Sequence, residues 1–464
     1  MLRDALLGAV AGAALATVPG SATWLTALCG ALLGAGAGVL LSRPARRPGR
    51  GRGARLLLAA FFIPALYFAV APGGDMAMHV ALARGLLHGE LSPAFPGVAV
   101  AAYPRGFSAL VSLLSPLGLA RAGLVAAGLS YSIFYTGLAA LVPWQAALVA
   151  VFLSRTPQIF FDWGGNPTAL ALGLGFAGAA AVRDRRGWLA ALLFAGAAAT
   201  HPMAACAAAL PAILEGSVAR NFRSLFAAAA GAGAVLLVLA LFGPAVSPRE
   251  LAWIRDYAAR EEAVPFLHTF AVLGDPAAVL TALSVLLLLW QRHVQPVLFA
   301  LLECLLLAGL FALLPHLGLY PARFAPLLLL VITPLWIRLP RAVLWLSLAA
   351  AIPFHLRWYQ TSEPMATQAD LEALACVERV VPKGAVIDGA YGDATQWIPA
   401  LTGRAVTRPH QHVSLFDETD AALARLPKAS FRFTGERLRY GAPLVPLPGS
   451  SLKLCGGALR KLSD

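Results

Sequence analysis

Apolar runs of about 20 residues recur along the chain, separated by short polar or basic connections. They are rich in Ala and Leu and do not alternate with period two. A helix of this length crosses a hydrocarbon core of about 30 Å, and at that depth a helix pairs its own backbone amides. The pattern predicts a mainly α fold, a polytopic transmembrane bundle of about 13 helices.

The predicted spans share this length and composition and fall at residues 3–20, 22–42, 55–72, 121–141, 143–155, 166–182, 187–200, 202–215, 223–243, 272–290, 295–315, 322–337 and 341–356. Segment 73–120 mixes polar and apolar residues and is rich in proline. We expect it to be a re-entrant or surface segment on the external side, with a juxtamembrane helix at 76–88.

The last hundred residues change character. Segment 365–380 has the pattern of an amphipathic helix, and 384–390 that of a short buried strand closed by glycine. We therefore predict three parts: a transmembrane hairpin with a basic linker at 1–54, a transmembrane domain at 55–356, and a small extramembrane α/β domain at 357–464. Cys376 and Cys455 lie in this last domain and can form a disulfide if it faces an oxidising compartment.

Composition and charge add an orientation. Hydrophobic residues make up 59% of the chain and charged residues 13%, about half the charged share of a soluble protein. Much of the net charge of +13 comes from arginines in the linker at 43–55, which is typical of a cytoplasmic loop rather than of nucleic-acid binding. Alternating spans then place the N-terminus and the other compact basic loops in the cytoplasm, and the C-terminal domain outside. We expect a bacterial inner (cytoplasmic) membrane protein with a periplasmic C-terminal domain.

The stretch PGGDMAMHVALARGLLHGE at 72–90 carries the candidate chemistry. Asp75 can cap a new helix through its carboxylate, and His79, four residues on, shares its face. Arg84 and His88 fall on the opposite side. A helix cap with an interfacial histidine is the structural alternative to an active site.

The larger pattern resembles the GT-C superfamily of polytopic glycosyltransferases, which use polyprenyl-phosphate-linked sugars. The resemblance covers residues 55–356. It rests on Asp75 after a helix exit, on the prolines and the segment Tyr103-Pro104-Arg105-Gly106-Phe107, on Asp162 in the next external loop, and on Tyr320-Pro321-Ala322-Arg323 at a late external helix end.

The resemblance implies transfer of a sugar from a polyprenyl-phosphate donor to a surface glycan, lipid or protein. Asp75 would be the general base, with His79 and Asp162 also catalytic. The residues expected to contact substrate are Arg323, Arg105, Tyr103, His201 and Tyr320. Many relatives carry paired acids in the first loop, whereas Met76 follows Asp75 here. The metal ligands are therefore unassigned, and participation of Mg²⁺ or Mn²⁺ stays open.

Two other functions stay open. A transporter or flippase of a lipid-linked substrate would show repeats and ionisable residues near mid-membrane; Glu303 is the clearest such residue. A non-catalytic assembly scaffold is the second. Three residues have a structural alternative to a binding role. His201 can serve a helix junction instead of the site. Trp397 and Arg404 can be a packed tryptophan and a turn arginine instead of contacts for a sugar or a lipid headgroup. His410 and His412 are two potential metal ligands without a third.

Overall fold

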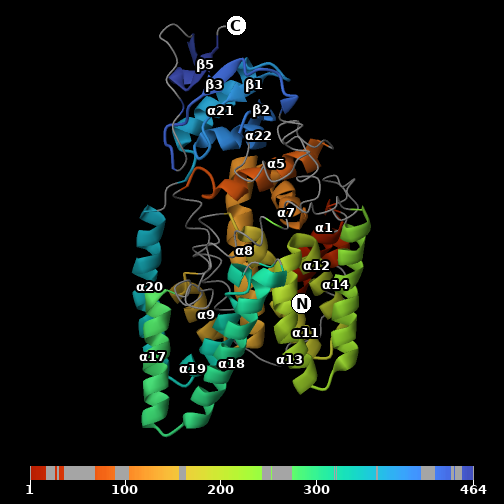
Figure 1. Cartoon of the computed structure of the whole chain (residues 1–464), viewed down its shortest axis with the longest axis vertical. Helices are drawn as coiled ribbons and strands as arrows, with labels where there is room; N and C mark the ends of the chain where they lie inside the picture. The colour runs from red at the N-terminus through yellow and green to blue at the C-terminus, as the bar shows by residue number, and fades with distance from the viewer. Residues whose placement is uncertain are drawn as a thin grey trace.

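The computed structural model describes residues 2–16, 27–28, 31–35, 68–88, 104–155, 164–242, 252, 274–317, 319, 321–361, 364–408, 424–439, 444 and 452–462 of the 464-residue chain. Within these ranges it is a helical bundle with a small mixed α/β domain at one end (Figure 1). The outline predicted from the sequence is thereby confirmed. The number of membrane spans stays a prediction.

The bundle contains α1 (Leu2–Leu15), α5 (Gly74–His88), α7 (Gly106–Leu113), α8 (Leu119–Leu141), α9 (Trp144–Leu153), α11 (Asn166–Arg183), α12 (Gly187–Thr200), α13 (Pro202–Val218), α14 (Phe222–Phe242), α17 (Asp275–Trp290), α18 (Val294–Leu313), α19 (Leu327–Trp336) and α20 (Arg341–Thr361). Short 3₁₀ turns connect some of them: η1 (Ser115–Leu117), η2 (Leu314–Leu317) and η3 (Pro321–Arg323).

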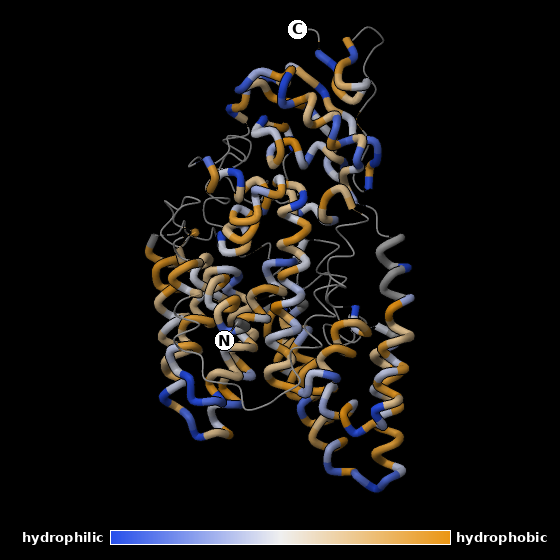
Figure 2. The backbone as a smooth tube through the Cα atoms, turned by 180° about the vertical axis from the view of Figure 1, so that it is seen from behind, coloured by the Kyte–Doolittle hydropathy of each residue, from blue (hydrophilic) through white to orange (hydrophobic). Residues whose placement is uncertain are grey.

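Among the described residues, three helical segments are long and apolar enough to cross a membrane: Leu119–Leu141, Phe222–Leu241 and Val294–Leu313. The last two expose most of their surface, whereas α8 is largely buried in the bundle. The other apolar helices have 10–17 residues. Figure 2 shows the consequence, with hydrophobic helices between hydrophilic turns at one end and the more polar domain at the other.

The bundle core is formed where α8 crosses α11 in close backbone contact. A Cβ on Gly173 would lie 2.5 Å from the backbone nitrogen of Phe134, and one on Gly137 would overlap the Gly173 carbonyl. Only glycine permits this approach, because any side chain would separate the helices. The Ala- and Gly-rich composition thus provides close packing as well as hydrophobicity.

The N-terminal helix is held by a nearly buried ion pair. Arg186, before α12, donates to the Asp4 carboxylate at 3.0 Å, and their side chains are 11% and 4% exposed. Further along, Ala11 packs against Gly196 of α12. The start of α1 therefore lies at the same end of the bundle as the α11–α12 turn.

The C-terminal domain contains a five-stranded sheet of order β2-β1-β3-β5-β4. Its strands are β1 (Val386–Asp388), β2 (Ala405–Val406), β3 (Phe431–Phe433), β4 (Lys453–Leu454) and β5 (Leu459–Lys461). β1 pairs in parallel with β2 and β3, and β5 pairs antiparallel with β3 and β4. The helical elements are α21 (Gln368–Val380), η4 (Ala394–Gln396), α22 (Trp397–Thr402) and η6 (Cys455–Gly457).

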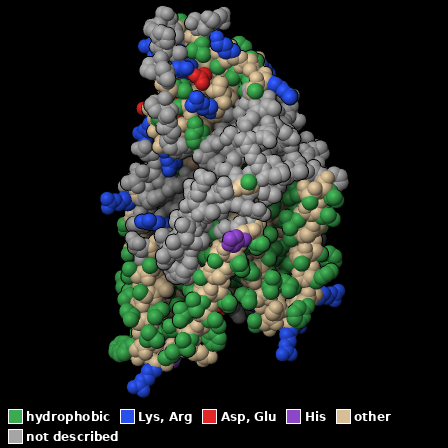
Figure 3. Space-filling view, viewed as in Figure 1, with side chains coloured by type: hydrophobic (Ala, Val, Ile, Leu, Met, Phe, Trp, Pro, Cys, Tyr) green, Lys and Arg blue, Asp and Glu red, His purple; other side chains and the backbone are tan. Residues whose placement is uncertain are grey.

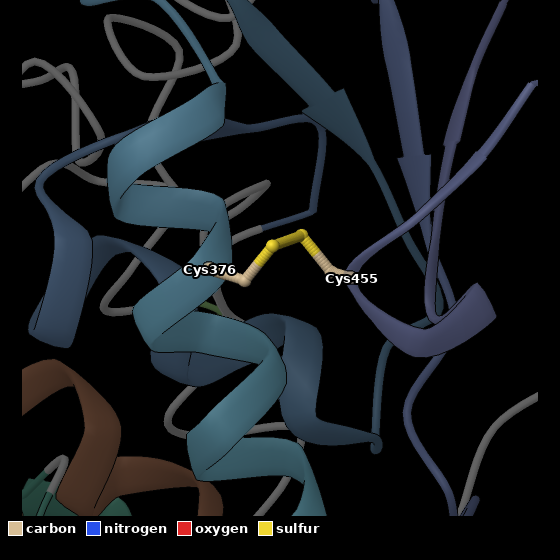
Figure 4. Close-up of a disulfide and its surroundings, with 2 residues drawn as sticks. All are labelled: Cys376 and Cys455. Carbon is tan, nitrogen blue, oxygen red and sulfur yellow. A yellow bond between two sulfur atoms is a disulfide. The ribbon is translucent and has the colours of Figure 1, made fainter.

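Two devices tie α21 to this domain. Thr367 and Asp370 form a capping box at its start, and the Asp370 carboxylate also accepts from the Glu436 amide at 2.9 Å. The disulfide that the sequence left open is present: Cys376 of α21 is joined to Cys455 beside β4 (Figure 4). The link crosses 79 residues of sequence, so it connects the first helix of the domain to the turn between its last two strands.

The C-terminal domain docks on the bundle through α5. The Arg84 guanidinium donates to the Leu401 carbonyl at 2.8 Å and contacts the Glu378 carboxylate at 3.4 Å. Leu401 lies in the last turn of α22, where carbonyls lack intrahelical partners, so a cation is favourable there. The α5 face opposite Asp75 and His79 is thus used to bind the domain.

Three boundaries differ from the predicted ones. The helix expected to continue to residue 72 does not, because 68–72 forms bends before Pro72 and Gly73, which has φ 98°. Segment 73–120, expected to contain one helix, also contains α7, which is short and follows Pro104. The span expected from 322 begins only at Leu327, because Pro321 and Pro326 enclose η3 and a turn.

The glycine contact between α8 and α11 gives a stability prediction. Gly173→Ala should destabilise the fold by about 1–3 kcal/mol, because the added methyl forces the helices apart. Gly309→Ala is the matched control, since nothing lies within 4 Å of a Cβ there; in the interior of α18 it should be neutral or stabilising by up to about 1 kcal/mol. Thermal unfolding of both purified variants in detergent measures the difference. Equal melting temperatures would contradict the close contact.

Candidate functional site

Asp75 lies in the first turn of α5, next to the turn at Gly164 that precedes α11. Gly164, with φ +90°, packs directly on it: a Cβ there would lie 2.8 Å from both the Asp75 Cβ and the Met76 amide nitrogen. The positive φ and this contact each require glycine at position 164. Asp162, two residues earlier in sequence, lies outside the described residues.

Asn166, the first residue of α11, holds the start of α5 in place through its side chain. Its side chain accepts a hydrogen bond from the Tyr131 hydroxyl at 2.9 Å and donates to the Met76 sulfur at 2.9 Å. The residue is fully buried. Gly165 occupies the N-cap position of α11, and the Asn166 side chain links α8, α11 and α5.

His79 is buried one turn after Asp75, with its ring 5.2 Å from that of Phe107 in an edge-to-face arrangement. Phe107 belongs to the first turn of α7. The residue before it, Gly106, packs on the last residue of α12, where a Cβ would lie 2.6 Å from the Thr200 hydroxyl oxygen. Arg105, at the N-cap of α7, is thereby placed next to the α12–α13 junction. Burial lowers the pKa of this arginine.

His201 occupies that junction and caps α13: its Nδ1 accepts from the Ala204 amide at 3.2 Å. Burial, followed by the charges of Arg323 and His79, lowers the pKa of His201 to about 3, while Asp75 acts in the opposite direction. The imidazole is therefore neutral at physiological pH. With Nδ1 accepting, the proton is assigned to Nε2.

These couplings bring predicted residues from distant segments together. Asp75 and His79 come from α5, His201 from the α12–α13 junction, and Arg323 from η3, which packs against α13. Asp75, His79 and Arg323 each lie within electrostatic range of His201. We call this group the junction cluster: Asp75, His79, His201 and Arg323.

Four helices begin at the junction cluster. α5 starts beside Asp75, α11 starts just after the Gly164 contact, and α7 and α13 start on either side of the Gly106–Thr200 contact. Helix N-termini carry unpaired amides and partial positive charge. Together with Arg105 and Arg323 they make a region that favours an anion. Asp75 is the carboxylate that the described residues place within it.

Other candidates lie elsewhere or outside the described residues. Tyr103, Asp162, Tyr320, His410 and His412 are all outside them. The described residues contain no group of three or more His, Cys, Asp and Glu side chains able to hold a metal, and the positive charge of Arg323 in the cluster disfavours a divalent cation. Participation of Mg²⁺ or Mn²⁺ therefore stays a prediction.

Two C-terminal candidates have structural roles. Trp397 is completely buried. The Arg404 guanidinium donates to the carbonyls of Val381, Thr402 and Glu378 at 2.9, 3.0 and 2.9 Å. It thus joins α21 to α22. The packed tryptophan and turn arginine expected as alternatives describe these residues.

Sequence reasoning missed the residues that position the cluster: Gly164, Asn166, Phe107 and Arg84. The two glycines before Asn166 predict a turn, but which helix that turn contacts depends on packing. The one usable signal was the spacing of Arg84 from Asp75, which places it on the opposite face of α5.

No family model matches the chain, and no curated protein matches it. Among solved structures, it is similar to the crystal structure of an oligosaccharyltransferase from Archaeoglobus fulgidus in complex with Zn and sulfate. Sequence identity is 13%, with 82% of this chain and 67% of that chain covered, and the TM-score is 0.39. A similarity this low carries no argument for fold or activity.

The lowered pKa of His201 predicts an acid-dependent loss of stability. Its folded value, about 3, lies below its ordinary value of 6.5. As the pH falls below about 6.5 the unfolded chain therefore binds the proton first, and stability decreases until about pH 3. The slope contributed by one histidine is at most about 1.4 kcal/mol per pH unit.

His201→Asn is the test, because the asparagine oxygen can keep the cap of α13 without titrating. Melting temperatures of wild type and variant should agree at pH 8 and diverge below pH 6, with the wild type falling faster. Parallel curves over the whole range would contradict a neutral His201 in the folded protein.

Proposed function

We propose that this protein is a membrane glycosyltransferase that transfers a sugar from a polyprenyl-phosphate donor to a surface glycan, lipid or protein. The observation that carries the proposal is the junction cluster together with Arg105: a carboxylate, two arginines and the N-termini of four helices. A reaction between a hydroxyl acceptor and a phosphate-linked sugar needs these two elements together: a base and a site for an anion.

The anion site would bind the donor phosphate. Arg323 can contact two phosphate oxygens in a forked geometry, and the helix N-termini supply backbone amides. As the bond between the anomeric carbon and the phosphate oxygen breaks, negative charge grows on the departing lipid phosphate. Preorganised donors stabilise that charge without reorganisation.

Asp75 would act as the base. The acceptor hydroxyl oxygen forms a bond to the anomeric carbon, its proton passes to the Asp75 carboxylate, and the lipid phosphate leaves with the electron pair of the broken bond. His79 and neutral His201 would orient substrate hydroxyls. Asp162, near Gly164 in sequence, is proposed as a further polar contact, and Tyr103 and Tyr320 as donor contacts.

The orientation proposed for the chain follows from its two ends. The arginine-rich turns lie at the end opposite the C-terminal domain (Figures 1 and 3), and such turns favour the cytoplasm. The Cys376–Cys455 disulfide favours an oxidising compartment for the other end. Both point to an inner-membrane enzyme with the junction cluster and the C-terminal domain on the periplasmic side.

The transporter alternative has less support. It calls for ionisable residues near mid-membrane along a pathway. Glu303, halfway along α18, is exposed on the outside of the bundle, whereas the arginines and carboxylate of the cluster gather at one end. No observation favours a scaffold.

Asp75→Asn should abolish transfer while leaving the fold intact, because the amide keeps the shape of the carboxylate but cannot accept the proton. We expect a decrease of about 10²–10⁴-fold in consumption of a polyprenyl-phosphate sugar by purified protein. Glu372→Gln is the matched control, an exposed acid of α21 far from the cluster, and should retain full activity. Activity of the Asp75 variant equal to the control's would remove Asp75 as the base.

The rate of transfer should depend on both the charge and the shape of the side chain at position 323. Arg323→Ala should lower kcat by about 10²–10³-fold through loss of leaving-group stabilisation. Arg323→Lys should recover part of it, since lysine keeps the charge without the fork. Arg121→Ala, at an exposed site near the start of α8, is the control. A change in KM alone, with kcat unchanged, would assign Arg323 to ground-state binding instead.

A further inference from the structure

Three turns between antiparallel helices share an unusual backbone position. Arg185 between α11 and α12, Arg220 between α13 and α14, and Arg292 between α17 and α18 have φ values of 59°, 49° and 58°. They are three of the four non-glycine residues with positive φ in the described part of the chain. We call these turns the arginine turns.

The arginine turns have the same hydrogen bonds. In each, the amide after the arginine reaches a carbonyl five residues back, as in Arg186 to Ala181, Asn221 to Gly216 and His293 to Leu288, all at 2.8 Å. This is the pattern that ends a helix with a left-handed residue, a position where glycine is usual because it avoids the steric cost of a Cβ. Arginine therefore occupies these three positions against local backbone preference.

The fold makes no use of these three side chains. Arg185, Arg220 and Arg292 are exposed, and none makes a hydrogen bond or ion pair within the described residues. The neighbouring arginines of the first turn behave differently, because Arg183 donates to the Ala140 carbonyl and Arg186 pairs with Asp4. Within the described residues, the folded chain therefore gives no reason for a cation at these left-handed positions.

Exposed aromatic side chains accompany each turn. Trp188 follows Arg185 and is 78% exposed, Phe222 follows Arg220 and is 63% exposed, and Trp290 precedes Arg292 and is 83% exposed. From the second and third turns, exposed apolar faces continue along α14, α17 and α18. Aromatic residues at the ends of apolar spans mark the level of lipid headgroups, so the arginines lie where headgroup phosphates would be.

The three turns belong to one end of the molecule. The first lies beside the second, because the Asn221 side chain donates to the Val182 carbonyl and Arg183 contacts Glu215 at the end of α13. Figure 1 places the α13–α14 and α17–α18 turns at the end away from the C-terminal domain. In Figure 3, Lys and Arg side chains project from that end below the hydrophobic surface.

We infer that the arginine turns form a binding band for anionic phospholipid headgroups, with the adjacent aromatics setting its depth. Each turn offers a guanidinium to a lipid phosphate at the border of the hydrocarbon. Electrostatic attraction of this kind contributes about fivefold to lipid binding for each basic residue at the surface. The band lies at the opposite end from the junction cluster and does not depend on the proposed reaction.

The backbone geometry supplies a test that separates charge from folding. In Arg185→Gly/Arg220→Gly/Arg292→Gly, glycine suits the left-handed positions, so the purified full-length variant without added lipid should melt at the wild-type temperature or about 1–3 °C higher. Adding phosphatidylglycerol should raise the melting temperature of the wild type, and at least half of that rise should be lost in the variant. The matched triple lysine variant keeps the charges and should keep the rise.

Phosphatidylcholine, which has no net charge, should give the same small shift in all three proteins. Two results would overturn the proposal. An undiminished response of the glycine variant to phosphatidylglycerol would show that the turns do not bind the anionic headgroup. A lower melting temperature of the glycine variant without lipid would show that the arginines serve the fold.

Discussion

The contact between Gly164 and the first turn of α5 is the constraint on which the rest of the site depends. It forces the starts of α5 and α11 together, and the Asn166 side chain holds this arrangement through Met76 and Tyr131. Helices that begin at one point direct their partial positive charges at that point. Among the described residues, α5 places the Asp75 carboxylate there, and Arg105 and Arg323 would add to the positive potential around it.

The same helix, α5, connects the two halves of the molecule. One face carries Asp75 and His79 into the bundle, and the other carries Arg84 to the end of α22 in the C-terminal domain. The disulfide and the buried Arg404 make that domain a rigid support. Movement of the domain would therefore be transmitted to the helix that bears the proposed base, which gives a domain without an assigned reaction a positioning role.

Charge is divided between the two ends in different ways. At the junction cluster, arginines and helix N-termini converge around a carboxylate inside the protein. At the arginine turns, the cations point outward and make no bond within the described residues. The first arrangement suits one phosphate held in a fixed geometry, whereas the second suits many exchanging headgroups. A basic net charge thus has two separate physical uses in one membrane protein.

The sequence alone determined the helical class and most helix positions in the bundle, because membrane thickness and amide pairing impose long apolar runs that can be recognised locally. The resemblance to a known superfamily supplied Asp75, His79, His201 and Arg323 as candidates, and their roles stay predictions. The sequence also indicated the Cys376–Cys455 pair. It missed α7 in the proline-rich segment, since that short helix depends on contacts with other helices. Only the tertiary structure decided that α5, η3 and the α12–α13 junction meet, because these segments are separated by more than a hundred residues and their meeting is set by glycine-mediated close packing rather than by any local pattern.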